Sequence, residues 1–262
     1  MYLGAFIFLI GLCVGSFLNV VIFRTRNERS IVRGRSRCTV CQIELRPAEL
    51  VPVLSFLFLR GRCRMCASKI SVQYPLVEFV TGSLFLLFFL RYTQGFALQD
   101  YINSSNIGIA FLRDIVFVAF LMIVFVYDLR YVEILDRFTV PAMGFALVMN
   151  LLLGVDAESL LLGASVLGGF FLVQYTISKG RWGGGGDIRM GLLMGLMLGL
   201  RDGLMALFIA YLIGALFGLV LIVSKRANWK TAIPFGTFLS IATLIVLLFG
   251  KPMLYWYLGL FM

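Results

Sequence analysis

The feature that most constrains the fold of this chain is a succession of long apolar segments separated by short polar ones. A helix needs about 20 mostly apolar residues to cross a bilayer, and 61% of these residues are hydrophobic while 14% are charged. A soluble domain carries about 25% charged residues. We therefore expect an all-α polytopic membrane protein with about eight transmembrane helices, at residues 2–23, 75–91, 108–127, 138–155, 159–178, 188–200, 203–223 and 232–250.

Lysine and arginine are unevenly distributed over the connections between these segments. The connections after the first, third, fifth and seventh segments hold 19 of these residues, and the opposite side holds four. The positive-inside rule places the basic side in the cytoplasm and the N-terminus outside. The same asymmetry accounts for the net charge of +10, so we expect membrane lipid and no nucleic acid as a partner.

The longest polar insertion, residues 24–74, carries two C-x-x-C pairs: Cys38 with Cys41, and Cys63 with Cys66. Twenty-one residues separate the pairs, slightly more than is usual for a four-thiolate zinc site. Four soft ligands complete a tetrahedron around zinc and leave no open position for catalysis. We expect structural Zn²⁺ in a cytoplasmic loop between the first two helices. The alternatives are four reduced thiols or two disulfides, the latter unfavourable in a reducing compartment.

Two acidic residues, Asp128 and Asp187, stand at the membrane ends of apolar segments. Asp128 follows a segment running inward and Asp187 begins one running outward, so the predicted topology places both at the cytoplasmic edge. A carboxylate within a membrane segment is a functional candidate because its burial is costly. Glu133 and Asp136 lie in the same connection as Asp128, and topology alone does not choose among the three.

Four consecutive glycines, Gly183–Gly186, precede Asp187 and would allow close approach of another element. Two nearby carboxylates can share one proton and act as base and acid, as in aspartic proteases. The chain has no histidine, which excludes Ser-His and Cys-His triads. No Gly-Lys-Ser/Thr follows the glycines, so they form no phosphate loop. On pattern alone, a flexible helix connection is the alternative.

The succession of motifs resembles bacterial type IV prepilin peptidases. These motifs are Gly15-Ser16-Phe17-Leu18-Asn19, the two C-x-x-C pairs, Tyr74-Pro75-Leu76-Val77-Glu78, Gly184-x-Gly186-Asp187 and Pro234-Phe235-Gly236. They cover nearly the whole chain in the family's order. The first C-x-x-C pair lacks a proline that is common in the family, and Thr237 stands where the family often has another proline.

The resemblance implies an intramembrane aspartyl endopeptidase with Asp128 and Asp187 as its catalytic pair. It implies a bacterial inner (cytoplasmic) membrane protein with a periplasmic N-terminus, prepilin or type II secretion pseudopilin substrates, and cleavage at the cytoplasmic face. It further implies N-methylation of the new N-terminal residue with S-adenosylmethionine. The residues that support the catalytic aspartates would be Gly184, Gly186, Asp136 and Glu78.

The corresponding division is a first transmembrane helix (1–23), a cytoplasmic zinc-binding domain (24–74) and a transmembrane peptidase domain (75–262). Glu78, just inside the second segment, either packs between helices or lines a substrate or methyl-donor site. Two other functions compete with proteolysis. Paired acids also serve proton-coupled transporters, and a membrane-anchored zinc module would need the cysteines but not the aspartates.

Overall fold

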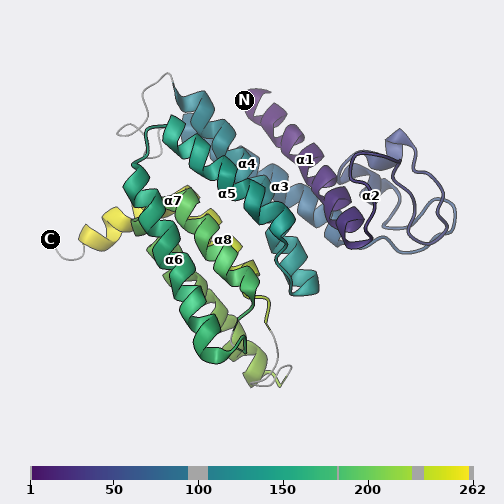
Figure 1. Cartoon of the computed structure of the whole chain (residues 1–262). Coiled ribbons are helices and arrows are strands. Elements are labelled where there is room, and N and C mark those ends of the chain that lie inside the picture. The colour runs from purple at the N-terminus through teal and green to yellow at the C-terminus, as the bar shows by residue number, and fades with distance from the viewer. Residues whose placement is uncertain (1, 94–105, 182, 226–232, 260–262) are drawn as a thin grey trace. The chain divides into compact units, whose positions relative to one another are not determined.

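The computed structural model describes residues 2–93, 106–181, 183–225 and 233–259. Within these residues the chain forms helices and no strand, only two isolated bridges. The elements are α1 (Tyr2–Arg26), the 3₁₀ helix η1 (Pro47–Leu50), α2 (Leu54–Phe58), α3 (Gln73–Thr93), α4 (Ile107–Tyr131), α5 (Asp136–Leu152), α6 (Ala157–Ser178), α7 (Gly185–Val223) and α8 (Phe235–Gly259) (Figure 1). The predicted all-helical membrane fold is confirmed.

In the part of the chain that the structure describes, six helices are long and apolar enough to cross a membrane: α1, α3, α4, α6, α7 and α8. The expected count of eight segments differs for two reasons. First, α5 has 17 residues and is about 26 Å long, slightly shorter than the roughly 30 Å hydrocarbon core. Second, the sixth and seventh expected segments both lie in α7, which is broken at Gly199.

The break divides α7 into a first segment (185–198) and a second segment (200–223). Gly199 has φ 76° and ψ −174°, a conformation that essentially only glycine adopts. A Cβ on Gly203 would lie 3.9 Å from the Cα of Gly195, although eight residues of continuous helix would separate them by about 12 Å. The second segment therefore folds back along the first, and α7 is a helical hairpin.

The break leaves backbone carbonyl and N–H groups of α7 without helical hydrogen bonds, and the side chains of Asn150 and Ser159 bind these groups. The Asn150 side-chain amide donates to the carbonyls of Leu196 (2.6 Å) and Met197 (3.2 Å), at the end of the first segment. The Ser159 hydroxyl accepts from the N–H of Leu200 (3.3 Å), at the start of the second. Inside a bilayer such groups have no water to bind, so other helices must supply partners.

A buried ion pair holds Asn150 in place. Arg113 donates to Asn150 Oδ1 (2.8 Å) and pairs with the fully buried Asp114 (2.7 Å). Arg113 also lies 5.7 Å from the centre of the Phe117 ring. The start of α4 and the end of α5 are therefore joined to the α7 break.

The described chain forms two compact units, Met1–Gln94 and Gly95–Met262. In the first unit, α1 and α3 are antiparallel and approach closely at small residues. A Cβ on Gly11 would lie 2.7 Å from Gly82 Cα, and one on Gly15 would lie 2.7 Å from Glu78 Cα. Close backbone contact of this kind is how membrane helices associate.

The second unit contains α4 to α8. Figure 1 shows α6 and α7 side by side, and their backbones approach closely: a Cβ on Gly195 would lie 2.2 Å from the Gly163 backbone. Gly191 and Gly195, in the first segment of α7, therefore lie against α6. The three-part domain division stays a prediction.

Candidate active site and candidate metal centre

Asp128 lies in the last turn of α4 and binds the first turn of α8. Its Oδ2 accepts from the backbone N–H of Thr237 (2.8 Å) and from the Thr237 hydroxyl (3.2 Å). Its side chain is buried, with the residue 3% exposed. The first turn of a helix has unpaired N–H groups and a positive dipole end, so it stabilises a negative charge. Asp128 is thus a carboxylate from one helix bound at the N-terminus of another.

Asp187 has a similar environment at the start of α7. Its Oδ2 accepts from the N–H of Gly184 (3.0 Å), and its own N–H donates to the Gly184 carbonyl (3.1 Å). A Cβ on Gly183 would lie 2.8 Å from the same oxygen, so the glycine leaves room for the carboxylate. Asp187 is partly exposed, unlike Asp128. The carboxyl groups of both predicted aspartates are therefore bound at helix N-termini.

Ile134, in the connection between α4 and α5, separates the two helix starts. It is buried, and a Cβ on Gly186 would lie 2.8 Å from Ile134 Cβ. On the α8 side, a Cβ on Gly236 would lie 2.6 Å from Ile134 Cδ1 and 3.0 Å from Asp128 Oδ2. Glycine is thus needed at both positions for α7 and α8 to approach this side chain and Asp128.

The two carboxyl groups lie at the same end of the helical unit and interact electrostatically. Asp128 is at the end of α4, while Asp187 and Thr237 are at the starts of α7 and α8. The hydrogen bonds of Asn150 and Arg113 lie at the opposite ends of α4, α5 and the first segment of α7. The location of both carboxyl groups at one end of the same unit is compatible with an acid–base pair, whose two members must reach one bound molecule.

The other acids near Asp128 are placed differently. Asp136 starts α5, is exposed, and forms an ion pair with Arg189 (2.5 Å). Glu133 is also exposed. Of these three acids, Asp128 alone is buried and bound at a helix N-terminus. The Asp136–Arg189 pair joins the start of α5 to the first turn of α7, two residues beyond Asp187.

A polar pair on α6 and α7 faces the Asp187 side of this site. Gln174 and Tyr211 share hydrogen bonds of 2.8 and 3.1 Å. The Tyr211 hydroxyl interacts electrostatically with Asp187, and its ring lies 4.9 Å from the ring of Phe235. Phe235 directly precedes the Gly236 and Thr237 that contact Asp128.

Sequence reasoning missed four of these residues: Ile134, Arg189, Tyr211 and Thr237. Thr237 had a usable signal, since it follows the Pro-Phe-Gly motif in the first turn of a predicted helix, where donors are unpaired. Ile134 had no such signal in the sequence, because an isoleucine in a connection next to apolar segments has no distinguishing pattern.

The two C-x-x-C segments in the first unit fold alike, one over residues 37–44 and the other over 62–69. In each, the N–H of the first cysteine donates to the carbonyl five residues later, and its carbonyl accepts from the N–H four residues later, at 2.8–3.0 Å. The residue at that fourth position, Gln42 or Ala67, has a positive φ of 58° or 55°. An isolated antiparallel bridge closes each turn.

The four cysteine sulfurs converge with a spacing that fits zinc. All lie within 4.8 Å of one another, and the pairs Cys38–Cys66 and Cys41–Cys63 are each 3.9 Å apart. Tetrahedral zinc with Zn–S bonds of about 2.3 Å separates its sulfurs by about 3.8 Å. A disulfide would need about 2.05 Å. The cluster can therefore hold a metal ion.

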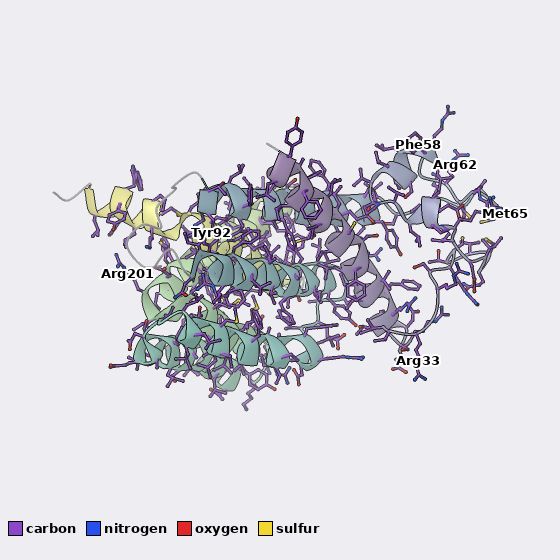
Figure 2. The ribbon with its side chains drawn as sticks, turned by 90° about the horizontal axis from the view of Figure 1, so that it is seen from above. Arg33, Phe58, Arg62, Met65, Tyr92 and Arg201 are labelled. Atoms are coloured by element: carbon purple, nitrogen blue, oxygen red, sulfur yellow. The ribbon has the colours of Figure 1, made fainter. Side chains whose placement is uncertain are left out.

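Backbone and hydroxyl donors favour the thiolate forms of Cys38 and Cys66, whereas the pKa of Cys41, which the Ile43 N–H lowers, is raised to about 11 by burial and by the other three cysteines. Although burial alone would raise it, the N–H groups of Cys41 and Val40 bring the pKa of the Cys38 thiol down to about 6. The Ser68 hydroxyl and N–H lower the pKa of Cys66. Figure 2 shows Phe58, Arg62 and Met65 at the outer surface of the same segment, where Phe58 and Met65 are exposed.

Glu78, the remaining predicted site residue, lies in the first unit. It is buried in α3 against Gly15 of α1, and its Oε2 accepts from the backbone N–H of Val53 (2.7 Å). Gly184 and Gly186 lie beside Asp187 as expected, and Asp136 lies at the start of α5. The site residues are thus divided between the two units.

Two family models match the chain. One, described as the type IV leader peptidase family, matches residues 115–219. The other, described as the bacterial peptidase A24 N-terminal domain, matches residues 9–92. The first range contains Asp128 and Asp187, and the second contains all four clustered cysteines and Glu78.

The chain is also similar to curated proteins named prepilin leader peptidase/N-methyltransferase. The protein from Bacillus subtilis (strain 168) is 31% identical over 253 residues, which cover 96% of each chain. The protein from Aeromonas salmonicida (strain A449) is 32% identical over 285 residues, covering 97% of this chain and 93% of the relative. The protein from Myxococcus xanthus (strain DK1622) is 41% identical over 164 residues, 62% of this chain and 45% of the relative. No solved structure matches the chain.

Proposed function

This chain belongs to the family of prepilin leader peptidases and N-methyltransferases, and we propose that it removes the basic leader peptide from prepilins or type II secretion pseudopilins. We propose further that it methylates the new N-terminal residue with S-adenosylmethionine. The observation that carries the proteolytic step is the pair Asp128 and Asp187, bound at two helix N-termini at one end of the same unit.

The peptidase mechanism uses the two carboxyl groups as one acid–base unit. One carboxylate takes a proton from a water molecule, whose oxygen attacks the carbonyl carbon of the scissile peptide bond. The other carboxyl group donates a proton to the departing amine, so no covalent enzyme intermediate is needed. Thr237 and Gly184 hold the two groups in position through the hydrogen bonds described above.

The topology of this proposal follows from charge. We place two parts of the chain in the cytoplasm, at the inner face of a bacterial cytoplasmic membrane: the end of α4 to α8 that carries the aspartates, and the cysteine segment (residues 27–72, between α1 and α3). The reason is that 19 of 23 basic residues fall on that side. The N-terminus is then periplasmic. Membrane lipid surrounds the helices, and nucleic acid has no part in the function.

The cysteine cluster has a structural role in this proposal. Cys38, Cys41, Cys63 and Cys66 would hold Zn²⁺ as a closed four-sulfur site. A bound ion would fix a segment that has only nine helical residues, four in η1 and five in α2. A transporter function is less well supported, because the two aspartates lie in terminal helical turns and not near a helix centre.

The direct test is cleavage of a prepilin by the purified protein in detergent, using the Asp128→Asn and Asp187→Asn variants. Asparagine keeps the size of the side chain but cannot exchange a proton as a carboxyl group does. Each variant should lose leader cleavage by at least about 1,000-fold. Glu158→Gln, an exposed substitution in the first turn of α6, is the control. Cleavage at the wild-type rate by either asparagine variant would refute the catalytic pair.

A further inference from the structure

The second activity in the proposed function has no residues assigned to it. The family model for the leader peptidase covers residues 115–219 and includes both aspartates, whereas the N-terminal unit carries neither. The names of the relatives include an N-methyltransferase. The proposed methylation, on which this inference rests, needs a side chain that accepts a proton from the substrate amine.

Methylation of an amine requires a base. The new N-terminus is mostly an ammonium group at neutral pH, since an α-amino group has a pKa of about 7.7–8.0, and an ammonium nitrogen has no free electron pair. Histidine is the usual base near this pH, but the chain contains none. A carboxylate in a buried position is the remaining common choice.

The N-terminal unit has four carboxyl side chains: Glu28, Glu44, Glu49 and Glu78. Glu28 is exposed. Glu44 is paired with Arg35 and Arg37, which lower its pKa. Glu49 is bound by the Arg46 N–H and by Arg64, which also lower its pKa. Arginine pairing leaves a carboxylate poorly suited to accept a proton.

Glu78 differs from the other three in burial and in partners. It is 8% exposed, and within the described residues no Lys or Arg forms an ion pair with it. Its partners are the Val53 N–H (2.7 Å) and the Ser16 hydroxyl. Nearby, Asn19 donates to the Tyr74 carbonyl (3.1 Å) and accepts from Gln73 (3.5 Å). The interface between α1 and α3 is therefore polar around Glu78, at the end where both helices join the cysteine segment.

The backbone at Val53 is strained where it meets Glu78. Val53 has φ 61° and ψ −50°, and a positive φ is unusual for a β-branched residue. Such strain persists where the surrounding structure enforces it, and it is concentrated at functional sites. Here it directs the Val53 N–H at the carboxylate and connects the cysteine segment to α3.

We propose that Glu78 is the catalytic base of the methylation step. Its carboxylate binds the α-ammonium group of the processed substrate and accepts one proton from it. The nitrogen then attacks the methyl carbon of the sulfonium donor. A C–N bond forms, the C–S bond breaks with its electrons going to sulfur, and a neutral thioether leaves.

The test is Glu78→Gln in the full-length protein, assayed with a prepilin and S-adenosylmethionine. Glutamine keeps an oxygen that accepts from Val53 but cannot take the proton. Leader cleavage should stay within about twofold of wild type, whereas the methylation rate, followed by mass spectrometry of the new N-terminus, should fall by about 100-fold or more. Calorimetric binding of S-adenosylmethionine should be unchanged, because Glu78 acts on the amine.

Each alternative outcome has a distinct meaning. If Glu78 only joins the loop to the helix, the glutamine variant methylates at the wild-type rate, and the inference is wrong. If the variant binds the methyl donor more than tenfold more weakly, Glu78 is a donor-binding residue and the inference is again wrong. Glu28→Gln, which removes an exposed carboxylate of the same unit, is the matched control and should keep both activities. If the wild-type protein cleaves but does not methylate, the proposed methyltransferase function itself fails.

Discussion

At the scale of single residues, glycines determine where the aspartates of the second unit can be. Asp187 needs a glycine at position 183 because a Cβ there would lie 2.8 Å from its carboxylate, and Asp128 needs one at 236 for a similar reason. Gly186 serves neither carboxylate directly. It lets the first turn of α7 contact Ile134, and this contact sets the distance of Asp187 from the α4–α5 connection.

Gly186→Ala should therefore reduce leader cleavage while the protein remains folded. The added Cβ would lie 2.8 Å from Ile134 Cβ, which is too close, so the start of α7 must move by several tenths of an ångström. Displacing a catalytic group by 1 Å can cost on the order of 100-fold in rate. We expect kcat/KM for a prepilin to fall by roughly tenfold or more, measured with purified protein.

Gly185→Ala is the matched control for this substitution. It lies one residue earlier in the same helical turn, and a Cβ there would have no neighbour within 4 Å. Its kcat/KM should stay within about twofold of wild type, since nothing has to move. Equal activity of the two alanine variants would show that contact with Ile134 does not position Asp187.

At the scale of helices, the decisive feature is the break in α7. The polar stretch Arg201-Asp202-Gly203 predicts two segments there, and the structure contains both, but the reversal occurs at Gly199. Composition could locate the break because charged residues end an apolar run. It could not identify Asn150 and Ser159 as the partners of the exposed backbone groups, because these residues come from other helices.

The same limit applies to the candidate site. The spacing and motifs were sufficient to select Asp128, Asp187 and the four cysteines. They could not select Thr237, Ile134 or Tyr211, because each acts through a contact with a residue more than 20 positions away or in another helix. Sequence patterns report which segments are helical, whereas contacts between helices depend on packing that the sequence does not display.

Gly199→Ala should destabilise the second unit. A residue with a side chain is strained at φ 76° and ψ −174° by about 1–3 kcal/mol, and its Cβ would also lie 2.7 Å from Ser159 Oγ. The midpoint of thermal unfolding in detergent should fall by several degrees. A change of 1 kcal/mol corresponds to about 2–4 °C in a domain of 150–250 residues.

Gly169→Ala in α6 provides the control for a glycine in a helix. A Cβ at this position would have no neighbour within 4 Å, and replacing glycine by alanine inside a helix is neutral or stabilising by up to about 1 kcal/mol. An unfolding midpoint for Gly199→Ala as high as that of Gly169→Ala would contradict the assigned break.

At the scale of the whole molecule, the candidate functional residues are divided between two units. Residues 1–94 hold the cysteine cluster and Glu78, and residues 95–262 hold both aspartates. The apolar helices of each unit have their own close contacts at glycines. The cysteine segment, in contrast, has only η1 and α2 as regular structure, and a segment of this size builds little core.

Removing the metal should therefore unfold the cysteine segment without unfolding the helices. We expect about one zinc ion per chain in the purified protein, and about none in the Cys38→Ser variant, because losing one ligand opens the tetrahedron. Chelation should make residues 27–72 sensitive to protease while the helical circular dichroism signal changes little, since the segment has only nine helical residues. Cys13→Ser, in α1 and outside the cluster, should keep its zinc and its resistance. A metal-free protein that resists proteolysis in this segment would show that the segment folds on its own and that the cluster is not what holds it together.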